Sequence, residues 1–212
     1  MMMRKGSISL LILIVSSIFL VRCKNSSNAA PEKDIVASPA KLSERTAEDI
    51  RSTLGYLKEN NGRLNDTVSF SFVQLADSLY HTNHYQALWF KEDRGLPAGD
   101  SLLDFIRNSR YSGLFPNDYH EHMLSFIQRV FQMDSNARKN AALWAREDLL
   151  MTDAFFLLTK HLRQGRLPYD SVTLRTDTVL PTAFYTDALN KVMQQGSVAQ
   201  VFHDLEPKSK GY

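Results

Sequence analysis

The sequence predicts an all-α fold: a mostly helical, bundle-like domain with one short extended segment, placed after a signal peptide and a flexible linker. Apolar residues recur at helical spacing through most of the chain beyond residue 44. Helix-ending glycines and asparagines stand between these stripes. With 212 residues and 43% hydrophobic content, the chain can bury one core. We therefore expect one folded domain over residues 44–212.

Residues 1–22 have the pattern of an export signal. Arg4 and Lys5 precede an uncharged apolar run from Ile8 to Val21. This run is shorter than the roughly 20 apolar residues that a membrane-spanning helix needs, which favours a signal peptide. We expect a protein of the bacterial cell envelope, on the periplasmic side.

Cys23, the only cysteine, lies at the end of the apolar run, separated from it by Arg22. The sequence LVRC resembles the lipobox of bacterial lipoproteins, with Leu20 at the leucine position and Arg22 where a small residue is usual. We predict lipidation of Cys23 and a lipid anchor in the membrane. The alternatives are cleavage near Ser27-Asn28-Ala29, or an uncleaved anchor with an inert cysteine. A single cysteine excludes an internal disulfide.

The lipidated tether is expected over residues 23–43, which are rich in Ser, Asn, Ala, Pro and Lys and too polar to form a core. Residues 1–23 contain three basic residues and no acid, so removing them from the 25 basic and 23 acidic residues leaves 22 and 23, a net charge of −1. This near-neutral remainder has no basic run, which argues against nucleic acid as a partner.

The first two helices follow from short apolar stripes. One is expected from Thr46, which stands at capping-box spacing from Asp49, to Asn61-Gly62, and its stripe is Ile50, Leu54 and Leu57. The next is expected over Phe70 to Tyr80. An aromatic connector, YHTNHYQALWF, follows it.

A third helix is expected to start at Asp100 or Ser101 and to stop before Gly113. The turn GLFPNDYH leads to a fourth helix with a single apolar stripe. That stripe consists of Tyr119, Met123, Phe126, Ile127 and Val130.

The longest helix is expected from about Ser135 to Gln164, ending at Gly165 as a left-handed residue. Its second half is apolar nearly all round, which predicts the central helix of the domain. Residues 171–180 alternate and include β-branched residues, so they are expected to be extended. Two short helices, Thr182 to Gln195 and Ser197 to Leu205, should follow, separated by Gly196.

Several motifs, in order, resemble the helical scaffold domain of the large YkuD-type L,D-transpeptidases of Gram-negative bacteria. The likeness spans about residues 70–212 and departs at Leu174, where a tryptophan is expected. Its motifs are Tyr80 with YQALWF (85–90), SGLFPNDYH (112–120), LLMTDAFF with LRQGRLP (162–168), and DLEPKSKGY (204–212).

The resemblance implies a non-catalytic part of an enzyme. Family members usually continue into a peptidoglycan-binding segment and a catalytic domain with a nucleophilic cysteine in a Ser-His-Gly-Cys type motif, which this sequence lacks. Cys23 has no histidine in its segment to activate it, so we expect no catalytic residue here. We interpret the chain as the N-terminal part of a longer product, or its remains after truncation. The expected partners are a catalytic domain of the same or a longer chain, peptidoglycan, and the membrane.

A candidate ligand or partner surface comprises aromatic residues, which stack on sugars, and arginines, which pair with carboxylates of stem peptides. These residues are Tyr85, Trp89, Phe90, Arg163 and Arg166. The stronger alternative is structural: aromatic residues near helix junctions usually fill the core, and arginines after a long helix usually cap it.

Histidines and one buried acid could imitate other sites. His81 and His84 form an HxxH pair, but His120 and His122 would point apart on a helix, so we expect solvated loop histidines and no metal. Asp153, within an apolar stretch, is expected to be a hydrogen-bonded packing residue. No phosphate-binding glycine loop or nucleophile elbow appears, and no cofactor is expected.

Two functions remain from the sequence. The chain is either the non-catalytic scaffold of a periplasmic L,D-transpeptidase that takes part in peptidoglycan cross-linking, or a free-standing helical envelope lipoprotein that acts as an adaptor or cell-wall-binding module. The first rests on the resemblance and the second on the missing catalytic motif.

Overall fold

The computed structural model describes residues 35, 36, 38–167 and 179–206. The domain is mostly helical, as predicted, and its strands in the described part are two short ones that form a hairpin. The helices are α1 (Pro39–Glu59), α2 (Val73–Thr82), α3 (Pro97–Asn108), α4 (Glu121–Met133), α5 (Ala141–Gln164), α6 (Thr182–Gln195) and α7 (Ala199–Leu205). The hairpin pairs β1 (Phe90–Lys91) with β2 (Arg94–Gly95) in antiparallel register. Short 3-10 helices lie at Ser109–Ser112, Pro116–Tyr119 and Ala137–Lys139.

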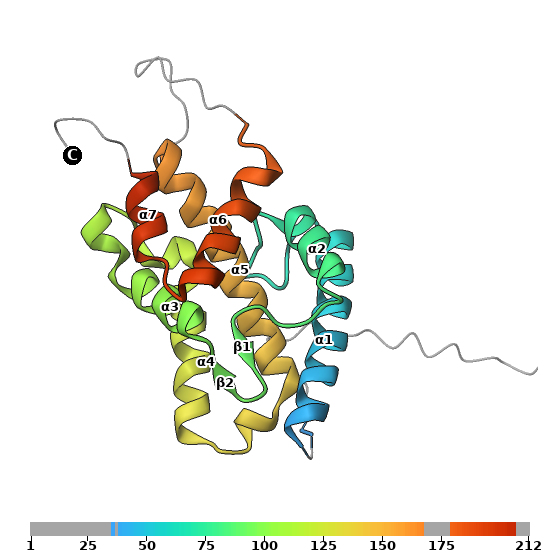
Figure 1. Ribbon diagram of the computed structural model, residues 1–212. Coiled ribbons are helices and arrows are strands. Elements are labelled where there is room, and N and C mark those ends of the chain that lie inside the picture. Colours follow the sequence, from blue (N-terminus) through green and yellow to red (C-terminus); the bar gives the residue numbers. More distant parts are fainter. Residues whose placement is uncertain (1–34, 37, 168–178, 207–212) are drawn as a thin grey trace, which may run out of the picture.

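Helix α5 is the centre of the domain, which confirms the prediction from its apolar sequence. In Figure 1 it runs through the middle of the molecule, with α1 and α2 on one side and α3 and α4 on the other. Helices α6 and α7 also contact it. Most of its side chains are buried, because helices surround it on all sides.

Helix α1 begins earlier than expected, at Pro39, so the last residues of the predicted linker are helical. Ser38 is its N-cap residue, and Pro39 suits the first helical position because a proline has no N–H to leave unpaired. Thr46 therefore lies within the helix, buried, and forms no capping box. The chain reverses after α1 at Asn61 and Gly62, whose φ angles are 52° and 79°. Gly62 is required there, because a Cβ would stand 2.5 Å from the carbonyl oxygen of Phe70.

The buried face of α4 differs from the predicted stripe. Leu124, Ile127 and Phe131 are buried, whereas Phe126 is 48% exposed. Tyr119 is buried but belongs to the preceding 3-10 helix, and His120 between the two has φ 60°. Helix α4 therefore begins at Glu121, and helical spacing counted from Tyr119 assigned the wrong residues to its buried face.

The ends of the later helices agree with the sequence for α6 but not for α5, which was expected to start at about Ser135 and starts at Ala141. Helix α6 has the predicted bounds, and Gly196 after it is left-handed with φ 67°. Helix α5 starts at the N-cap Asn140, whose side chain accepts a hydrogen bond from the N–H of Ala142. It ends before Gly165, whose φ of 82° is positive but whose ψ of 158° is not that of the left-handed helix region. The extended segment predicted for residues 171–180 lies almost wholly outside the described residues.

Candidate functional site

The aromatic connector is anchored to α5 through Asp148. This carboxylate is fully buried and accepts hydrogen bonds from the hydroxyl of Tyr80 and from the N–H groups of Leu88 (3.0 Å) and Trp89 (2.9 Å). Thr152, one turn further along α5, bonds the Tyr80 hydroxyl at 2.7 Å and accepts from the Trp89 indole N–H at 2.9 Å. Burial raises the pKa of Asp148 to about 6, while these hydrogen bonds oppose the rise. Every oxygen of the cluster is used in holding the connector.

Asp153 anchors a second segment to α5, as the packing interpretation predicted. Its Oδ1 accepts from the backbone N–H groups of Ser71 and Phe72, both at 2.8 Å, and its Oδ2 lies 2.8 Å from Nε2 of His120. The expectation of a solvated loop histidine was wrong for His120, because its side chain is only 11% exposed. The described residues contain no group of three or more His, Cys, Asp or Glu side chains that could hold a metal ion.

Residues of the motifs SGLFPNDYH and LRQGRLP contact each other at the C-terminal end of α5. Arg166, just after α5, forms an ion pair with Asp118, and its guanidinium lies 4.2 Å from the centre of the Phe115 ring. The hydroxyl of Tyr119 lies 2.9 Å from Nδ1 of His161. Burial lowers the pKa of His161 and raises that of Tyr119.

Arg166 borders a hollow of about 670 Å³ that we call the arginine hollow. Its lining residues are Arg107, Arg110, Gly113, Leu114, Phe115, Pro116, Asn117, Asp118, Glu121 and Arg166. Asp104 pairs with Arg107, whereas Arg110 is exposed and has no ion-pair partner within the described residues. Phe115, 58% exposed, supplies an aromatic surface at the edge. This combination can bind a carboxylate next to an apolar group.

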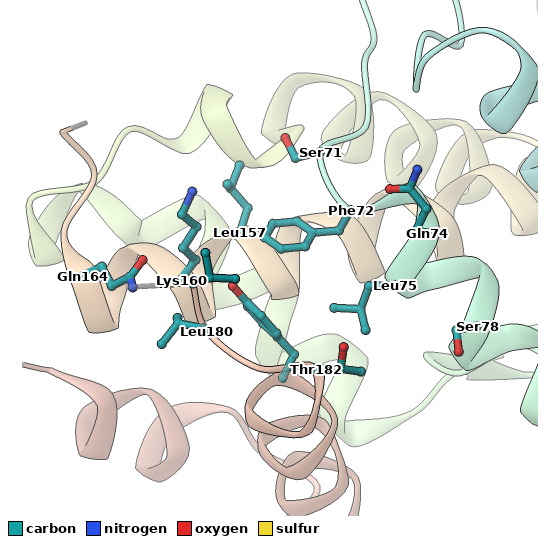
Figure 2. A pocket seen from close by; sticks show the side chains of 12 residues that line it. Ser71, Phe72, Gln74, Leu75, Ser78, Leu157, Lys160, Gln164, Leu180 and Thr182 are labelled. Atoms are coloured by element: carbon teal, nitrogen blue, oxygen red, sulfur yellow. The ribbon is translucent and has the colours of Figure 1, made fainter. Parts of the chain in front are cut away.

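A second cleft, of about 610 Å³, lies between α2, α5 and α6. Figure 2 shows Phe72 and Leu75 reaching into it from the α2 side and Leu157 and Lys160 from α5. Its floor is apolar, and its rim carries hydroxyl and amide groups. Lys160 is the one charged side chain that lines it in the described part of the chain.

The five residues of the predicted ligand surface fall in separate places. Trp89 (1% exposed) and Phe90 (5%) are buried. Tyr85 is half-buried beneath the Arg51 guanidinium, which lies 5.4 Å from its ring centre. Arg163 is exposed near the end of α5, and Arg166 borders the arginine hollow. Arg107 and Arg110 could not be predicted as neighbours of Arg166 from the sequence, because they belong to a different helix and the turn after it.

Cys23 and the apolar run before it lie outside the described residues, so their lipidation stays a prediction. Within the described ranges, no helix has both the length and the apolar character needed to cross a bilayer.

The geometry defines a helical domain in which separate sequence motifs are held together on one central helix. Comparison with protein families matches residues 74–212, about two thirds of the chain, to the Scaffold domain, which is the scaffold domain of L,D-transpeptidases. The chain therefore belongs to this family, as the order of its motifs had predicted. Comparisons with curated proteins and with solved structures find no match. Helix α1 and the loop after it precede the matched residues, although α1 packs along α5.

Proposed function

We propose that this chain is the non-catalytic scaffold region of a periplasmic L,D-transpeptidase and takes part in peptidoglycan cross-linking. The family match to the scaffold domain is the observation that carries this proposal. The arrangement around α5 supports a structural role, because the matching motifs meet in buried hydrogen bonds rather than around an open reaction centre. The proposed location is the periplasmic side of the envelope, with Cys23 as the lipid-anchored residue.

We further propose that the arginine hollow contacts the stem peptides of peptidoglycan. Those peptides carry carboxylates, and Arg110 offers a guanidinium with no ion-pair partner among the described residues. Phe115 provides an exposed ring beside it. Arg166 is positioned at the same hollow by Asp118 and lines it through its partly exposed side chain.

The function is tested by deleting the gene and analysing the muropeptides of the cell wall by mass spectrometry. We expect a lower fraction of 3-3 cross-links, restored when the gene is returned. An unchanged fraction of 3-3 cross-links would reject the cross-linking role and favour the adaptor lipoprotein instead.

The mass of the native protein from the envelope is a second measurement. A mass near that of residues 23–212 plus lipid supports a free-standing lipoprotein.

The contact surface is tested by co-sedimentation of the full chain with purified peptidoglycan. Arg110→Ala should reduce the bound fraction several-fold, because it removes the guanidinium that has no ion-pair partner in the described structure. Arg129→Ala is the matched control, since Arg129 is an exposed arginine of α4 that does not line the hollow. Equal losses in both variants would show that binding depends on overall charge rather than on this hollow.

A further inference from the structure

A third pocket, of about 300 Å³, lies where the hairpin, α3, α4 and α5 meet. It differs from the two larger hollows because aromatic rings and a buried acid line it. We call it the Glu147 pocket. The residues that matter for its chemistry are Trp89, Phe90, Phe131, Trp144 and Glu147. Its volume is at the lower end of the range for small-molecule sites.

The rings form a continuous aromatic wall. The Trp144 ring lies 4.4 Å from that of Phe90 and 4.2 Å from that of Phe131, centre to centre. The Trp144 indole N–H donates to the carbonyl oxygen of Arg138, so the ring is fixed in position. The wall is therefore rigid and apolar, and it suits contact with an alkyl chain.

Glu147, which lines this pocket, has one oxygen without a hydrogen-bond partner among the described residues. The residue is 2% exposed, and its Oε1 accepts a hydrogen bond from the side-chain amide of Gln128. Its Oε2 is buried and has no hydrogen-bond partner among the described residues. Burial, with a smaller contribution from the neighbouring charge of Asp148, raises the pKa of Glu147 to about 7. A buried carboxyl oxygen without a partner costs free energy, so a ligand that donates a hydrogen bond to it gains affinity.

The other charges around the pocket do not neutralise Glu147. Asp93 and Asp100 add acids to its lining, and Arg94 and Arg138 add bases. Arg138 is already engaged, because its Nε donates to the carbonyl oxygen of Phe131 at 3.1 Å. From outside the lining, Asp148 opposes the ionisation of Glu147 and Arg107 favours it. With all these groups ionised, the lining carries three acids against two bases, which favours a cationic ligand.

We propose that the Glu147 pocket binds a primary alkylammonium group, with the ammonium N–H donating to Oε2 of Glu147 and the alkyl chain lying against the aromatic wall. The inference does not depend on the proposed function. A free alkylamine and a lysine-type side chain of a peptide share this chemistry. The ammonium supplies the missing donor, and the alkyl chain packs against the aromatic part of the lining.

Intrinsic fluorescence tests this directly, because the two tryptophans of the chain, Trp89 and Trp144, both line the pocket. Pentylamine is titrated into the full chain at about pH 8, where Glu147 is ionised and the amine stays charged. We expect a saturable fluorescence change. 1-Pentanol has the same chain without the charge, and it should bind at least about tenfold more weakly. Equal responses to both, or no saturable response, would overturn the proposal.

Glu147→Gln keeps the size of the side chain and removes its charge, and it should weaken pentylamine binding at least about tenfold. Asp104→Asn is the matched control, because Asp104 is an exposed acid outside the pocket. Should Glu147→Gln fail to fold, the wild-type chain still decides. Affinity must fall at about pH 5, because Glu147 is protonated and uncharged there while the amine keeps its positive charge. Unchanged affinity at about pH 5 would reject the role of Glu147.

A lysine-containing peptide, compared with its ε-acetylated form, distinguishes a free alkylamine from a lysine side chain of a peptide as the ligand. Tighter binding of the free-lysine peptide than of pentylamine identifies a peptide.

Discussion

Glu147 and Asp148 are adjacent acids of α5, both buried, but their surroundings differ. Asp148 faces α2 and the aromatic connector, where a hydroxyl and two backbone N–H groups donate to it. Glu147 faces α4 and the pocket, where Gln128 satisfies one oxygen and nothing described satisfies the other. An acid whose oxygens are all bonded within the protein holds the fold together. An acid that lines a pocket and has an oxygen without a partner among the described residues has capacity left for a ligand, so burial alone does not separate structural from binding residues.

Replacing Asp148 tests the structural side of this comparison and has the largest expected effect. Asp148→Ala leaves the hydroxyl of Tyr80 and the N–H groups of Leu88 and Trp89 without their acceptor in the core. We expect the free energy of unfolding to fall by roughly 3 to 5 kcal/mol, measured by urea denaturation. Asp104→Ala, at an exposed acid, should change it by no more than about 0.5 kcal/mol. A loss below about 1 kcal/mol for Asp148→Ala would mean that water replaces the carboxylate.

The pH dependence of stability tests the other side. Glu147 holds its proton more tightly in the folded chain than in the unfolded one, because burial raises its pKa from 4.5 to about 7. Its contribution to stability is therefore greatest below about pH 4.5 and is lost as the pH rises through about 7. The loss is on the order of 3 kcal/mol at most.

Glu147→Gln should remove this part of the decline and leave the smaller part that belongs to Asp148, whose pKa is raised from 3.8 to about 6. Unfolding free energies of both proteins at a series of pH values provide the measurement. Parallel curves for wild type and variant would show that Glu147 does not titrate differently in the folded state.

The smallest effect is expected at the surface. Arg166→Ala removes the ion pair with Asp118 and the contact with Phe115, but the Arg166 and Asp118 side chains are 34% and 32% exposed. We expect a loss of less than about 1 kcal/mol in unfolding free energy, and a smaller one at high salt. Arg163→Ala, at an exposed arginine three residues earlier, should have almost no effect. A loss as large as that of Asp148→Ala would place Arg166 among the residues that determine the fold.

The sequence predicted the fold well where the pattern was local. The nearly uniform apolar character around Asp153 identified α5 as the central helix, and Gly196 correctly separated α6 from α7. The prediction failed where local rules compete. Thr46 and Asp49 have the spacing of a capping box, yet Leu42 is 2% exposed and its burial extends α1 back to Pro39.

The candidate sites could be predicted only in part, because they depend on contacts between distant segments. Arg166 was a candidate, but Arg107 and Arg110 become its neighbours only when α3 packs beside the end of α5. His120 was expected in solvent, since nothing in the sequence shows that its partner is Asp153, 33 positions away. Glu147 belongs to no motif that the sequence analysis recognised. It became a candidate ligand-binding residue because one of its oxygens has no hydrogen-bond partner among the described residues, which only a folded structure reveals.

The residues just before α1 have a mechanical consequence. The N–H of Val36 donates to the carbonyl oxygen of Lys139 at 3.0 Å, and Ile35 forms an antiparallel bridge with Asn140, the N-cap of α5. Tension applied to the chain from the N-terminal side would therefore load the start of the central helix before it reaches α1. A pull on the chain at these residues would therefore be resisted first at the start of the most deeply packed helix rather than by α1 alone.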